Sequence, residues 1–172
     1  VFHTGYYSYR SNKIHTLDIH ASAGIVKPEL SHVMNSSMWL YHIQTDESLV
    51  FHIRRLTDTW PLDFYLGGNL HTNYTWKYHT QYSNNFLNYD IAIDLGIAPM
   101  LRSEFKLFRH QWHAGFRLVV PLLAGYVRPG FSSSFPNEML VAENRFKGAL
   151  QSITIASLGS YQRLQTEFSL NY

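Results

Sequence analysis

The chain has 172 residues, of which 45% are hydrophobic, 16% aromatic and only 15% charged, with a formal net charge of +2. This length favours one domain, residues 1–172, and the lack of cysteine excludes disulfides and thiolate metal sites. No basic cluster accompanies the net charge, so we expect no nucleic-acid partner. The longest apolar run, residues 118–127, is about half a membrane-spanning helix and contains Pro121, which excludes a helical membrane protein.

Taken in chain order, most of the sequence alternates apolar and polar residues with the two-residue period of a β-strand. The expected strands are residues 1–9, 14–26, 37–44, 48–56, 62–71, 86–108 (as one long strand or two), 111–127, 148–158 and 164–172. Short turns are expected at residues 45–47, 57–61, 108–111 and 159–162, and longer connections at residues 27–35, 79–85 and 128–147. No helix of useful length is expected.

Each expected strand has one apolar face and one polar face; Ile91 and Leu95, for example, alternate with Asp90 and Asp94. Such alternation occurs in soluble β-sandwiches and in membrane barrels. Three features favour the membrane: the polar face mixes charged residues with glycine, lysine is scarce along the strands, and aromatic residues cluster near strand ends, as in interfacial girdles. We therefore predict an all-β, antiparallel up-and-down transmembrane β-barrel of eight strands, or of ten.

The predicted connections contain one inconsistency. Short turns and long loops should alternate in an outer-membrane barrel, yet three strands, an odd number, separate the short turns at residues 45–47 and 108–111. One assignment is therefore wrong. The alternation keeps its parity across Asp46 from residue 37 to residue 53, and residues 86–108 keep theirs through Pro99.

The C-terminal strand is the nearest feature to a motif: Thr166, Phe168, Leu170 and Tyr172 share one face, and the strand ends on an aromatic residue. With this ending, the pattern resembles the small outer-membrane β-barrels of Gram-negative bacteria over nearly the whole chain. The resemblance implies a bacterial outer-membrane location, contact with outer-membrane lipid and with other envelope proteins, and no cofactor. The expected role is a structural element, a narrow channel or a subunit of a larger envelope complex.

The polar faces carry charges that a narrow lumen must pair, because an isolated buried charge is costly. We expect a lumen polar network of Asp18, His20, Asp63, Tyr65, Asp90, Asp94, Arg102, Glu104, His113 and Arg117. Further charges available for pairing are Arg54, Lys106, Arg163 and Glu167. Side chains would plug an eight-stranded lumen, whereas a ten-stranded one would leave a thin water path, so a plug and a slim pore both stay open.

An outer-membrane lipid hydrolase is an alternative function. Barrels such as lipid A deacylases and phospholipases use a Ser–His pair in which the imidazole activates the hydroxyl. His79 and Ser83 are the candidates here, although their spacing departs from the compact pattern of the deacylase family. Whether the chain is an enzyme stays open, with a non-enzymatic role preferred.

The ten histidines show no metalloprotease spacing, and no metal site is predicted. A soluble, lipocalin-like ligand-binding barrel is the third hypothesis. The early glycines, Gly5 and Gly24, lack the Gly-x-Trp signature of lipocalins, which weakens it.

Overall fold

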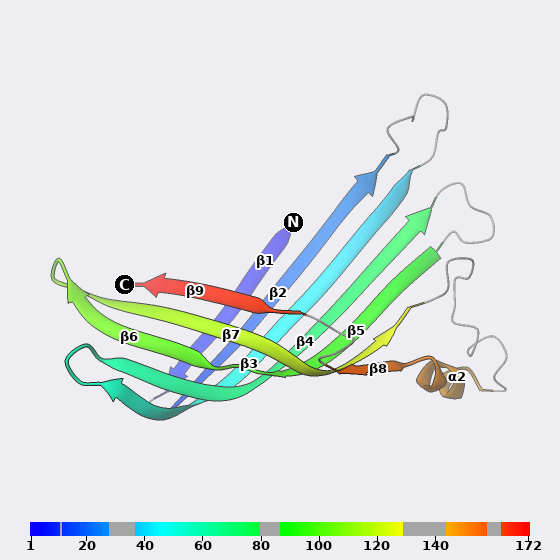
Figure 1. The fold of residues 1–172 in the computed structure, drawn as a ribbon. Coiled ribbons are helices and arrows are strands. Elements are labelled where there is room, and N and C mark those ends of the chain that lie inside the picture. Colours follow the sequence, from blue (N-terminus) through cyan, green and yellow to red (C-terminus); the bar gives the residue numbers. More distant parts are fainter. Residues whose placement is uncertain (11, 28–36, 80–86, 129–143, 158–162) are drawn as a thin grey trace.

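The computed structural model describes residues 1–10, 12–27, 37–79, 87–128, 144–157 and 163–172, and their fold is all-β, as predicted (Figure 1). The elements are β1 (Phe2–Arg10), β2 (Lys13–Val26), β3 (Met38–Thr57), β4 (Leu62–His79), β5 (Leu87–Ile97), β6 (Met100–Leu107), β7 (His110–Val127), the short helix α2 (Arg145–Gln151), β8 (Thr154–Ser157) and β9 (Gln165–Asn171). In these described ranges, no helix has the length and apolar character needed to cross a bilayer.

All neighbouring strands of the sheet are antiparallel. β5 and β6 lie end to end, with a break at Ala98 and Pro99, because both pair with β4 on one side and with β7 on the other. β8 and β9 likewise pair with two halves of β7. The nine strands of the described sheet therefore occupy seven positions, which differs from the predicted eight or ten.

The turn predicted at residues 45–47 is wrong. β3 runs unbroken through Asp46 and is paired there with β2 on one side and β4 on the other. A polar tripeptide is typical of a turn, but here two neighbouring strands satisfy its backbone. With one long β3, short connections (β1–β2, β3–β4, β6–β7) alternate with longer ones (β2–β3, β4–β5, β7–β8), and the two kinds leave the sheet at opposite ends (Figure 1).

Two further expectations need correction near the C-terminus. The strand predicted at residues 148–158 is only β8, four residues long, and α2 precedes it where no helix was expected. A seven-residue helix spans about two turns, which is too short to produce a recognisable helical period.

Burial along the strands is the reverse of that in a water-soluble sheet. On β5, Leu95 is 53% exposed, whereas its neighbour Asp94 is fully buried. On β3, Ile43 is 49% exposed and Asp46 only 1%. The apolar faces therefore point outward and the polar faces point into the molecule.

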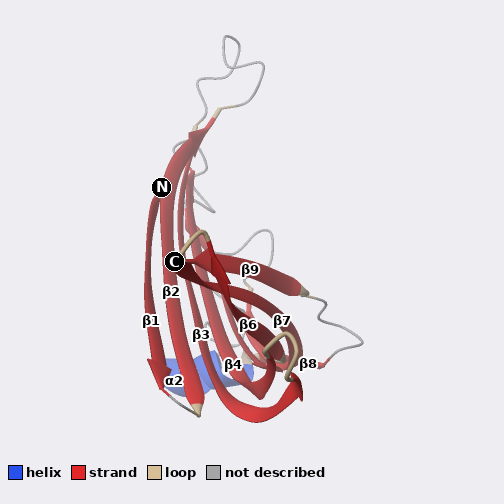
Figure 2. Ribbon diagram, turned by 90° about the vertical axis from the view of Figure 1, so that its left-hand side faces the viewer, coloured by secondary structure: helices blue, strands red, loops and turns tan. Residues whose placement is uncertain are grey.

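The sheet curves so that β1–β4 face β6, β7 and β9 (Figure 2). Tyr9 of β1 lies against Arg102 of β6, whose guanidinium carbon is 3.9 Å from the ring centroid. Tyr7 of β1 lines the same small cavity as Ser169 and Asn171 of β9. The antiparallel strands thus form a closed barrel core, and within the described ranges it is side chains, not a hydrogen-bonded ladder, that bring β1 and β9 together.

A compact apolar layer fills part of this interior. Its members come from β2, β3, β4, β6, β7 and the β5–β6 break and are at most 5% exposed: Ile14, Val50, Tyr65, Ala98, Met100 and Val119. The interior is therefore packed with side chains at this level.

Candidate functional site

A row of ionisable side chains crosses four adjacent strands inside the barrel. Asp46 of β3 is in register with Asp18 of β2 and with His71 of β4, and His71 is in register with Asp94 of β5. These four residues share the inward parity of their strands, so the sheet places them at one level. Three carboxylates on one wall require cations from the opposite wall.

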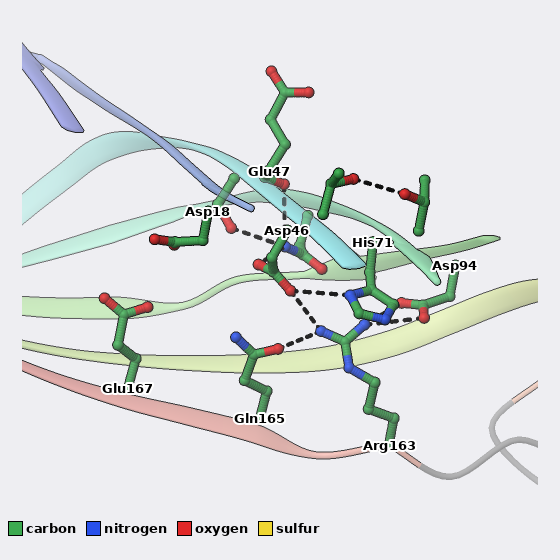
Figure 3. A network of polar contacts seen from close by, with 12 residues as sticks. Asp18, Asp46, Glu47, His71, Asp94, Arg163, Gln165 and Glu167 are labelled. Carbon is green, nitrogen blue, oxygen red and sulfur yellow. Dashed lines mark hydrogen bonds and ion pairs between the residues drawn. The ribbon is translucent and has the colours of Figure 1, made fainter. Parts of the chain in front are cut away.

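Two arginines, Arg163 and Arg117, supply those cations from the far side of the interior, and Figure 3 shows the contacts of Arg163. Arg163, just before β9, places Nη2 2.6 Å from Asp46 Oδ2 and Nη1 3.0 Å from both carboxylate oxygens of Asp94. Arg117 of β7 donates to Thr16 and Glu167, with Asp18 at 3.7 Å and Asp46 at 3.8 Å. The two arginines therefore link β2, β3 and β5 to β7 and β9.

Asn69 and His71 complete the hydrogen bonding of Asp46. The Asn69 amide donates to Asp46 Oδ1 at 2.8 Å and to the Ser48 hydroxyl at 3.0 Å, and His71 Nδ1 lies 3.3 Å from Asp46 Oδ2. Asp46 thus has hydrogen-bonding partners on both oxygens. This arrangement suits a structural ion cluster, because both oxygens of the Asp46 carboxylate already have hydrogen-bonding partners.

A second cluster lies toward the end of the barrel from which the longer connections leave. Asp90 of β5 accepts from Lys77 at 3.0 Å and from Arg128 at 2.7 Å. The three line a cavity of about 600 Å³ together with Asn73, Thr75, Tyr126 and four apolar residues. This end of the barrel interior therefore carries two cations, Lys77 and Arg128, and one anion, Asp90.

A third cluster lies toward the short turns. Arg102 Nη2 is 3.0 Å from Glu104 and 3.0 Å from His113 Nδ1. Nearby, Asp63 accepts from Arg55 at 3.1 Å and contacts His52 at 3.2 Å. The hydrogen bond from the Arg55 guanidinium holds the pKa of the Asp63 carboxyl below its ordinary value.

The structure thus distributes eight of the ten predicted lumen residues over these three clusters, while Tyr65 and His20 lie elsewhere in the interior. Tyr65 bonds to Tyr9 and lies in the apolar layer, and His20 stacks on His3 with centroids 4.0 Å apart. Asp63 pairs with Arg55, which was not among the cations expected from the sequence, and bulges at residues 52–54 and 55–57 shift the register there.

Sequence reasoning missed the centre of the network. Asp46 was assigned to a turn, and His71, Asn69 and Ser48 were not among the site candidates. The unbroken parity across Asp46 was the signal that could have found it. The pairing of Arg163 with Asp46 and Asp94 spans 117 and 69 residues, and no local pattern predicts it.

His79 is the last residue of β4, and Ser83 lies outside the described residues. Among those described, no group of three or more histidine and acidic side chains has a geometry that could hold a metal ion. Comparison of this chain with protein-family models, with curated proteins and with solved structures finds no match.

Proposed function

We propose that this chain is an integral β-barrel protein of the bacterial outer membrane, acting as a structural element or as a membrane-embedded subunit of a larger envelope complex. The observation that carries the proposal is the reversed burial: leucine and isoleucine face outward while aspartate and arginine fill the interior. Apolar side chains facing outward are stable in lipid, and transmembrane barrels have polar interiors.

The height of the apolar surface supports the same proposal. On the outer face of β3, the exposed aromatic residues Tyr41 and Phe51 are ten residues apart. At about 3.3 Å per residue and a strand tilt of about 40°, this separation gives a height of about 25 Å, the usual apolar band of such barrels. Tyr41 packs on Trp76 at one border, and Trp112 packs on Tyr172 at the other.

The connections also fit this class. Outer-membrane barrels have short turns on the periplasmic side and longer loops outside. Here the short and long connections leave opposite ends of the sheet (Figure 1). On this basis, the short turns would face the periplasm and the cavity beside Asp90 would open outward.

The packed interior favours a structural role over a channel. The apolar layer of Ile14, Val50 and Val119 is nearly inaccessible, and the ion pairs of Arg163 and Arg117 cross the interior beside it. A water path would have to displace both. A soluble, lipocalin-like barrel is disfavoured because its apolar face would point inward, toward a ligand.

Leu95→Arg tests the membrane proposal against a soluble fold. An exposed leucine in water tolerates arginine within about 0.5 kcal/mol, whereas arginine on the lipid face near the midplane costs about 2–4 kcal/mol. We expect denaturant unfolding from lipid vesicles to show that the free energy of unfolding of the variant is lower by about 2–4 kcal/mol. Leu107→Arg, at the β6–β7 turn, is the matched control and should change little.

The wild-type protein should also float with liposomes and migrate differently on gels before and after boiling. If the protein is monodisperse without detergent and Leu95→Arg unfolds like the wild type, the proposal is wrong.

A further inference from the structure

Polar residues, among them an acid and two bases, occupy several outward positions on β1–β4. At outward positions of the first four strands lie Thr4, Ser8, Lys13, His15, Thr45, Glu47 and Thr72. On β5, by contrast, the outward positions from Tyr89 to Ile97 are all aromatic or aliphatic. We call the residues on β1–β3 (Thr4, Ser8, Lys13, His15, Thr45, Glu47) the outer polar patch.

The centre of the outer polar patch is an acid paired with a histidine. His15 Nε2 lies 2.8 Å from Glu47 Oε1, and the two side chains are 36% and 46% exposed. The ring of Tyr6 packs edge-on against His15, and beside them the Thr45 and Thr72 hydroxyls are 2.7 Å apart. The polar atoms of these groups are paired with one another, yet the His15 and Glu47 side chains remain partly exposed on the outer face of the barrel.

The position of Glu47 makes this patch unusual for a lipid-facing surface. Glu47 lies between Tyr41 and Phe51 on β3, inside the apolar band on which the proposed function rests. Ionisable residues at membrane depth are costly in lipid and normally contact protein or water. The patch therefore indicates a neighbour other than lipid on this side.

Given the proposed membrane location, we propose that the outer polar patch forms the contact between two copies of this chain. The patch is self-complementary in charge, since Glu47 is acidic and His15 and Lys13 are basic. A twofold axis along the membrane normal keeps both copies in one orientation and brings the acid of one patch toward the bases of the other.

Single cysteines test this contact, because the chain has none of its own. Leu49→Cys places a thiol beside the patch on β3, and Leu95→Cys places one on the outer face of β5; both leucines are exposed. In liposomes, a flexible bis-maleimide should cross-link Leu49→Cys to a dimer and leave Leu95→Cys monomeric. Adding Glu47→Leu to Leu49→Cys should abolish the dimer while the unboiled gel shift is kept.

Three outcomes would overturn the dimer: equal cross-linking of the two cysteine variants, no cross-link in either, or a dimer that survives Glu47→Leu. Flotation and the unboiled gel shift are measured on the same samples. Failure to insert would overturn the membrane proposal, whereas insertion without a specific cross-link would overturn the dimer alone.

Discussion

Arg163 is the side chain on which the central ion cluster depends most. It contacts Asp46 and Asp94, which are 1% and 0% exposed. Arg163→Met would leave two carboxylates buried with too few cations, a change that costs about 3–5 kcal/mol. Denaturant unfolding in lipid vesicles should show this loss, which would be absent if water reaches the cluster freely.

Arg128→Met is the control for Arg163→Met. Arg128 also binds an aspartate, at 2.7 Å, but its side chain is 71% exposed. Exposed ion pairs contribute about 0–1 kcal/mol, so this variant should unfold close to the wild type. Equal destabilisation by the two substitutions would contradict the assignment of Arg163 to a buried cluster.

Gly67 lies where β3 and β4 approach too closely for a side chain. A Cβ there would lie 1.9 Å from the Leu49 carbonyl oxygen and 2.6 Å from the Val50 Cα. Since backbone must move to relieve this overlap, Gly67→Ala should destabilise by about 1–3 kcal/mol. Gly24→Ala, with nothing within 4 Å of its Cβ, should be nearly neutral in the same unfolding measurement.

At the scale of elements, the β6–β7 hairpin turns through two residues in the left-handed region. Phe108 has a φ of 50° and Arg109 a φ of 71°, and Leu107 pairs with His110 across them. Both central residues of a type I′ turn have this conformation, which costs ordinary residues about 1–2 kcal/mol each. The hairpin therefore forms because its long strands, β6 and β7, hold it closed.

Substitutions at Arg109 should change stability in opposite directions. Arg109→Gly removes the backbone strain and should gain about 1 kcal/mol, whereas the β-branched Arg109→Val should lose stability. Thermal unfolding in detergent micelles would measure both. A gain from valine, or a loss from glycine, would mean that the Arg109 side chain contributes more than its backbone conformation costs.

At the scale of the whole molecule, the barrel interior consists of successive levels of side chains. Charges near Asp90, the cluster around Asp46, the apolar layer with Ile14, and the Arg102 cluster follow one another toward the short turns. Each level draws side chains from several strands. The levels therefore tie the curved sheet together across its interior.

This packing predicts that the protein does not conduct ions steadily. In planar bilayers, we expect the wild type to show no stable open state at moderate voltage, because both the apolar layer and the ion pairs block the lumen. Arg163→Met leaves the apolar layer intact and should stay closed. Steady single-channel currents from the wild type would require an open path and would favour the narrow-channel role.

The sequence by itself determined the all-β class, most strand positions and which residues share a face, because side-chain direction in a strand alternates with parity. The sequence positions of Ile91 and Asp90 alone place their side chains on opposite faces of the strand. The strand break at Pro99 and the helix α2 were harder to predict from the sequence, since a short interruption or a seven-residue helix leaves little periodic signal. The membrane location stays a prediction.

Only the tertiary structure decided what Asp46 does. Its local sequence, Thr45-Asp46-Glu47, is typical of a turn, and the strand forms because β2 and β4 pair with it on both sides. The partner Arg163 is 117 residues away and reaches Asp46 only because the sheet curves back on itself. Curvature and register are properties of many paired strands together, and no single segment of the chain specifies them.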